Sequence, residues 1–127
     1  MKTQYAVSGS LLVGIAVGAF AIQTLHAQTT PPVYAVIDIE SITNAEAYKA
    51  IFAKAQASAS ASGGKFIIRT DKITAADGKP PSRFALIAFD SMAKAEAWKA
   101  SAAQKEVDDI RLKNSVSRQF FAEGTPQ

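Results

Sequence analysis

The chain of 127 residues contains no cysteine and a single histidine, His26. Without cysteine there are no disulfides, so packing must hold the fold together. His26 lies in a segment with the features of an export signal, described below, so the mature chain is expected to have neither residue type. This excludes Ser–His and Cys–His nucleophile pairs, the usual zinc sites and histidine-ligated haem. We expect no cofactor.

Acidic residues are too scattered to suggest a metal site made of oxygen ligands, which needs several clustered carboxylates. The only adjacent acidic pair is Asp108 and Asp109. We interpret this pair as part of a solvent-exposed helix face, and therefore expect no metal.

No charge of one sign dominates the chain, which has 14 basic and 11 acidic residues. Without residues 1–27, which include Lys2, 13 basic residues remain against 11 acidic ones, a net charge of +2. Such balanced charge predicts no nucleic-acid surface. No basic amphipathic helix suggests binding to a membrane surface either.

One long hydrophobic run is present, "LLVGIAVGAFAI" at residues 11–22. It follows the positive Lys2 and precedes the small residue Ala27, which is typical of a secretory signal peptide. We expect residues 1–27 to be cleaved after Ala27, leaving a periplasmic or secreted protein with no stable membrane association. An uncleaved anchor is the alternative, because residues 5–25 are nearly long enough to span a bilayer.

The mature chain contains an internal repeat. "YAVIDIESITNAEAYKA" at residues 34–50 aligns with "FALIAFDSMAKAEAWKA" at residues 84–100, with 8 of 17 positions identical. Each copy begins with the apolar, β-branched pattern of a strand and continues with the spacing of a helix. The repeat therefore predicts two equivalent strand-to-helix units.

The full pattern alternates between strands and helices. After an extended spacer at 28–32, we predict a strand at 33–40, a helix at 43–62, strands at 65–73 and 83–90, a helix at 91–114 that breaks near Ser101, a strand at 115–123 and a loose tail at 124–127. Two right-handed βαβ units in this order form the ferredoxin-like plan. The predicted domain, residues 33–123, is α+β, with a four-stranded antiparallel sheet and both helices on one face.

The alternation of side chains along a strand assigns the two faces of this sheet. Ala35, Ile37, Ile39 and their repeat equivalents form an apolar set that belongs beneath the helices. The opposite face has no helix left to cover it and carries residues such as Tyr34, Val36, Asp38, Phe84 and Leu86. An exposed apolar patch usually marks an interaction site. We therefore predict a homodimer in which two such faces meet by two-fold symmetry.

Several strings together resemble the bacterial family called domain of unknown function 1330, of the dimeric α+β barrel superfamily. They are "YAVIDIE", "NAEAY", "GGKFIIR", "SRFALIAFDSM" and "AEAWKAS", with Arg111 following. The resemblance covers residues 33 to about 122. It implies a ferredoxin-like protomer that dimerises through its sheet, and no established activity. The chain departs from the family pattern at Ala88, where glutamate is usual, and at "SAAQ" (101–104), where "SPEY" is usual.

Asp38 is the strongest candidate for chemistry, because a charge in the middle of an apolar strand is disfavoured unless paired. It could act as a general base or ligand anchor in the cavity between the two sheets. The alternative that we favour is an ion pair with Arg69 or Arg118. Arg69 could equally bind a carboxylate or enolate. The predicted catalytic residues are thus Asp38 and Arg69.

The predicted ligand-binding set contains Tyr34, Asp38, Arg69, Arg83 and Leu86. These residues would surround a small organic ligand between the sheets of the dimer, without catalysis. A cofactor-independent monooxygenase or isomerase acting on small aromatic or carbonyl compounds is the second hypothesis, by analogy with the superfamily. A non-catalytic structural dimer is the third. The sequence leaves open whether the protein is an enzyme.

Overall fold

The two repeated segments supply the central strands of a four-stranded antiparallel sheet. β1 (Val33–Ile42) pairs with β3 (Arg83–Phe89) on one side and with β4 (Ser115–Glu123) on the other, and β2 (Lys65–Thr70) pairs with β3. The order β2-β3-β1-β4 is that of the predicted ferredoxin-like fold. The computed structural model describes residues 30–126, so the predicted signal peptide lies outside the described residues.

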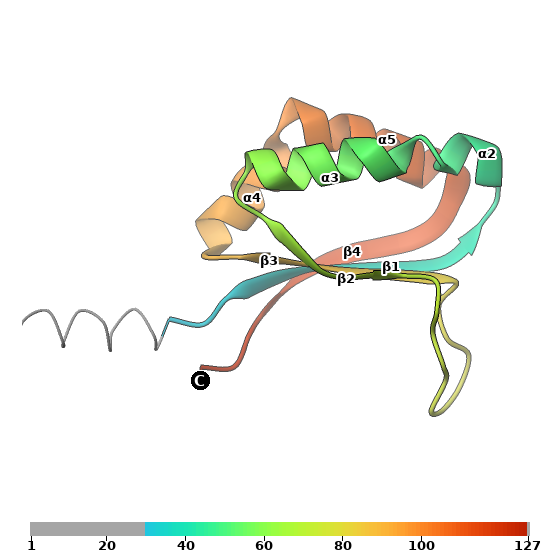
Figure 1. The fold of residues 1–127 in the computed structure, drawn as a ribbon, viewed down its shortest axis with the longest axis horizontal. Helices are drawn as coiled ribbons and strands as arrows, with labels where there is room; N and C mark the ends of the chain where they lie inside the picture. Colours follow the sequence, from blue (N-terminus) through green and yellow to red (C-terminus); the bar gives the residue numbers. More distant parts are fainter. Residues whose placement is uncertain (1–29, 127) are drawn as a thin grey trace, which may run out of the picture. The chain divides into compact units, whose positions relative to one another are not determined.

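Four helices cover one face of this sheet (Figure 1). They are α2 (Ala45–Tyr48), α3 (Ile51–Ala61), α4 (Met92–Ala100) and α5 (Ala102–Asn114). The predicted break near Ser101 is confirmed. The first predicted helix also divides, at Lys49 and Ala50, but both residues keep right-handed helical dihedral angles. The apolar stripe that begins at Tyr48 and Ile51 therefore continues across this interruption.

Short polar side chains start three of these helices. Asn44 Oδ1 accepts from the Ala47 amide at 3.1 Å, and the hydroxyls of Ser91 and Ser101 accept from amides three residues ahead, each at 3.2 Å. Such caps satisfy amides that the first helical turn leaves unpaired. None of the helices among residues 30–126 is both long and apolar enough to cross a membrane.

The core lies between the helices and the predicted inner face of the sheet. Ala35, Ile39, Ile87 and Phe89 are each at most 2% exposed. The ring of Phe89 packs against that of Trp98 with centroids 5.3 Å apart. Burial of these side chains provides most of the stabilisation available to a domain without disulfides.

Two glycines join α3 to β2, as the sequence predicts. Gly63 has a φ of 78°, the left-handed conformation that ends many helices. Gly64 lies against the core: a Cβ atom there would be 2.7 Å from a ring carbon of Phe89. The missing side chain therefore lets β2 approach the core closely.

The opposite face of the sheet is not covered by any helix among the described residues (Figure 1). Its middle row runs across all four strands through Ile68, Leu86, Val36 and Phe120. Phe120 is 47% exposed and Ile68 is 39% exposed. We call this surface the open face.

A bulge interrupts β2 at Ile67. Phe66 pairs with Ile87, but Ile68, two residues later, pairs with the adjacent Leu86. One extra residue reverses the faces of the side chains that follow it. Arg69 consequently pairs with Ala85 and belongs to the helix-covered face.

Candidate ligand-binding site

A small cavity lies on the helix-covered face, between the sheet and α2, α3 and α5. Its volume is about 40 Å³, enough for roughly three water molecules. Most of its wall is apolar and comes from all four strands and the helices above them. The polar lining residues are Tyr48, Arg69, Arg83, Trp98, Gln104, Arg111 and Gln119. The cavity therefore combines an apolar wall with a few polar groups, the usual composition of a small-molecule site.

Aromatic rings hold two arginines on one side of this cavity. The Arg69 guanidinium lies 4.7 Å from the centroid of Phe66 and donates to the carbonyl of Phe52 at 2.6 Å. The Arg83 guanidinium lies 4.7 Å from the centroid of the same Phe52. These cation–π contacts keep both charges at the cavity instead of in bulk solvent.

The electrostatics of Tyr48 and Arg69 reflect this arrangement. Burial lowers the pKa of Arg69, and the neighbouring charge of Arg83 lowers it further. Burial raises the pKa of the Tyr48 hydroxyl, and the charges of Arg83, Arg111 and Arg69 oppose this rise. Tyr48 thus remains protonated at neutral pH, with three guanidinium groups around it.

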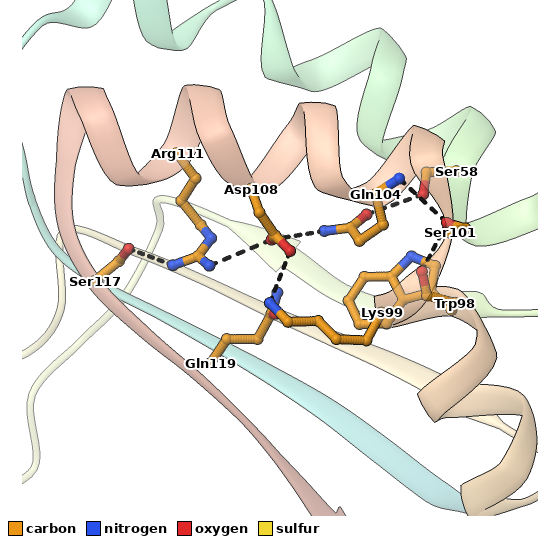
Figure 2. A network of polar contacts seen from close by, with 9 residues as sticks. All are labelled: Ser58, Trp98, Lys99, Ser101, Gln104, Asp108, Arg111, Ser117 and Gln119. Carbon is orange, nitrogen blue, oxygen red and sulfur yellow. Dashed lines mark hydrogen bonds and ion pairs between the residues drawn. The ribbon is translucent and has the colours of Figure 1, made fainter.

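A polar network centred on Asp108 lies beneath α5 (Figure 2). Its carboxylate accepts from Lys99 Nζ at 2.7 Å, from Gln104 Nε2 at 2.9 Å and from Arg111 Nη2 at 3.3 Å. Ser58 donates in turn to the Gln104 carboxamide oxygen at 2.9 Å. The network therefore links α3, α4 and α5 and fixes the orientation of two cavity-lining side chains, Gln104 and Arg111.

Three buried N–H donors on lining residues have no hydrogen-bond partner among residues 30–126. They are Trp98 Nε1, Arg111 Nε and Gln119 Nε2. Because lysine can only donate, the contact from Lys99 holds the Gln119 oxygen and leaves its amide group unpaired. Most buried polar atoms in folded proteins have partners, and all three of these unpaired donors belong to residues that line the cavity.

The model of the family described as domain of unknown function, DUF1330, matches residues 32–125. The chain belongs to the DUF1330 family. The match spans every strand and helix of the fold, and it confirms the resemblance on which the fold prediction partly depended.

Solved structures show the same fold for this DUF1330 protein. A protein of unknown function from Rhodopseudomonas palustris has a TM-score of 0.60 at 15% identity, over 77% of this chain and 85% of that chain. Its methylated form gives 0.53 at 15% identity, over 79% and 87%. A putative antibiotic biosynthesis monooxygenase from Nitrosomonas europaea gives 0.47 at 17% identity, over 76% and 91%. None of the curated proteins compared with the chain matches it.

Three of the predicted ligand-binding residues, Tyr34, Asp38 and Leu86, belong to the open face of the DUF1330 fold and do not line the cavity beneath the helices. Asp38 forms an ion pair with Arg118, with N–O distances of 3.0 and 2.9 Å. Arg118 is one of the two partners considered for it from the sequence. Both residues line a hollow of about 300 Å³ beside Pro80. This hollow is larger than the cavity beneath the helices, but its lining includes the Asp38–Arg118 ion pair and no unpaired buried donor.

Arg69 and Arg83, the other two predicted residues, line the cavity beneath the helices and not the space between two sheets, where they were expected. The expectation that Arg69 shares a site with Asp38 is wrong, because the bulge at Ile67 turns Arg69 to the other face of the sheet. Strict alternation from Lys65 would have placed Arg69 on the open face.

Most of the Asp108 network was not predicted from the sequence. Asp108 was expected on a solvent-exposed helix face, but it is 8% exposed, whereas its neighbour Asp109 faces solvent and pairs with Lys113. The spacing of Gln104, Asp108 and Arg111 places them on one side of a helix, and this was the available signal. Among residues 30–126, no group of three histidine, cysteine, aspartate or glutamate residues could hold a metal ion.

Asp108→Ala should destabilise the protein by about 3 kcal/mol, because it leaves the buried Arg111 guanidinium without its carboxylate. Asp109→Ala is the matched control one residue away. Its carboxylate makes an exposed contact, and its loss should cost about 0.5 kcal/mol or less. Urea denaturation followed by circular dichroism measures both. Equal effects of the two substitutions would contradict the structural role of Asp108.

Proposed function

We propose that this DUF1330 protein binds a small organic ligand in the cavity between its helices and its sheet, without catalysing a reaction on it. The unpaired donors of Trp98, Arg111 and Gln119 carry this proposal, because a bound molecule with acceptor atoms would satisfy them. The lining residues include no aspartate, glutamate, histidine or cysteine that could serve as a base or nucleophile.

The second hypothesis, a cofactor-independent enzyme with Asp38 as its base, stays a prediction. In its favour, the hollow beside Asp38 has room for a small substrate. Against it, the Asp38 carboxylate is engaged by Arg118, and a base is most effective when it can reach the proton it removes.

Ala55→Leu should abolish ligand binding, because Ala55 lines the cavity and the larger side chain would occupy about the space of the ligand. Ala85→Val fills the same cavity from the sheet. A library of small molecules, screened by ligand-observed NMR, supplies the measurement. Compounds whose NMR signals change in the presence of the unmodified protein should show no such change with either variant.

Ala57→Leu is the control for this experiment, because Ala57 lies on the exposed side of the same helix, α3. It should bind the same compounds as the unmodified protein. If compounds bind equally well to all variants, and circular dichroism shows each one folded, the cavity is not the binding site.

We further propose that the protein is a homodimer formed through the open face. The row of Ile68, Leu86, Val36 and Phe120 is apolar and crosses the whole sheet. Burial of such a row against a second copy would remove it from water, and a two-fold axis would let one surface serve both partners.

Phe120→Asp should convert this dimer to a folded monomer, because it places a charge in the apolar row. Leu112→Asp is the control: Leu112 is 63% exposed, but it lies on α5, which packs on the opposite face. Sedimentation velocity at micromolar concentration gives the mass of the parent protein and of each variant. A monomeric parent protein, or dimers of both variants, would exclude this interface.

Export is the remaining part of the proposal, with cleavage after Ala27. The run at residues 11–22 and the small residue at the predicted cut support it. Intact-mass measurement of protein recovered from the periplasm should give a chain that starts at Gln28. A full-length mass in the membrane fraction would instead indicate an anchor.

A further inference from the structure

The charged residues that line the cavity beneath the helices are all basic. Its lining residues include three arginines, Arg69, Arg83 and Arg111, and no acidic residue. The Asp108 carboxylate neutralises the charge of Arg111, with which it forms an ion pair in the network shown in Figure 2. Within the described part of the chain, Arg69 has no carboxylate within 4.0 Å, and Arg83 has only the exposed Asp71, at 3.9 Å. The Arg69 and Arg83 side of the cavity is therefore cationic and poorly neutralised.

These two arginines lie over the same aromatic ring. Both guanidinium groups contact the ring of Phe52, with centroid distances of 5.5 Å for Arg69 and 4.7 Å for Arg83. Like charges so placed repel each other, and their partial burial weakens the screening by water. A carboxylate bound at this side of the cavity would offset the repulsion, because guanidinium groups bind carboxylates through charge-assisted hydrogen bonds.

The unpaired polar atoms of the cavity also favour an anionic ligand. Trp98 Nε1, Arg111 Nε and Gln119 Nε2 are all donors, and the described residues leave no buried side-chain acceptor unpaired. A carboxylate offers only acceptors, about four lone-pair sites on two oxygens. An amide or ammonium group would bring its own donors to a cavity that already has too many.

The size of the cavity limits the rest of the ligand. A volume of about 40 Å³ corresponds to about three water molecules, so the ligand has a short apolar chain and not a system of several rings. Side chains such as Ile37, Ile51 and Val107 provide the apolar wall that such a chain would contact.

We propose that the ligand is a short-chain organic carboxylate, an inference that rests on the proposed function. Arg69, Arg83 and the unpaired donors of the cavity would bind its anionic group. This names the chemical class for the site and assigns Arg69 and Arg83 as the residues that determine its charge preference.

The test compares acetate, butyrate and hexanoate with their neutral amides, which have nearly the same shape. Trp98 is the only tryptophan in the chain and lines the cavity, so its fluorescence reports occupancy directly. Titrations at constant ionic strength remove general salt effects. At least one carboxylate should saturate the signal and bind about tenfold or more tightly than its amide, as expected for a charge-assisted hydrogen bond.

Arg69→Gln and Arg83→Gln should each weaken carboxylate binding about tenfold and weaken binding of the matching amide less, because the amide carries no charge. Arg118→Gln is the control: it removes the same charge from the chain, but Arg118 is on the open face and 76% exposed. Arg118→Gln should bind like the parent protein. Circular dichroism checks that each variant is folded.

The outcomes separate this inference from the proposed function. The charge preference would be overturned if amides bound as tightly as carboxylates. It would also be overturned if the arginine variants bound carboxylates as tightly as the parent protein. In either case the cavity would remain a ligand site. If no carboxylate saturates the signal, this inference is wrong. If the small-molecule library also shows no binding that Ala55→Leu removes, the proposed function is wrong as well.

Discussion

The bulge at Ile67 is the local feature on which the candidate site depends. It adds one residue to β2 between Phe66 and Ile68 and so reverses the faces of the strand beyond it. Arg69 therefore enters the cavity beside Arg83 instead of the open face beside Asp38. With strict alternation Arg69 would lie on the open face, and the cavity would be lined by one arginine fewer.

The second constraint is the Asp108 carboxylate, which holds Lys99, Gln104 and Arg111 in fixed positions beneath α5 (Figure 2). Because Lys99 also holds the oxygen of Gln119, the same network decides that the amide group of Gln119 stays unpaired. The Asp108 network thus contributes both to stability and, through Arg111 and Gln119, to the preference of the cavity for acceptor groups. The apolar open face is separate from this arrangement, and a second copy could cover it without closing the cavity.

The fold was predictable from the sequence because local signals agreed with one another. The repeat of residues 34–50 at 84–100 marked the two strand-to-helix units, and alternation along β1 and β3 assigned both faces correctly. The site was much less predictable. A bulge has no clear signature in "KFIIRT", so Arg69 was assigned to the wrong face. Asp108 and Asp109 are adjacent residues of the same type, and the spacing of Gln104, Asp108 and Arg111 was the one available sign that the first is buried and the second exposed.

The most direct test of the account is the indole N–H signal of Trp98 in a two-dimensional ¹H–¹⁵N NMR spectrum. The chain has one tryptophan, so this group gives one resolved peak, and its nitrogen is among the unpaired donors. Addition of a bound carboxylate should shift the peak saturably and downfield, as a new hydrogen bond forms. A carboxylate that binds without moving this peak, and moves open-face amides such as that of Val36 instead, would contradict the account.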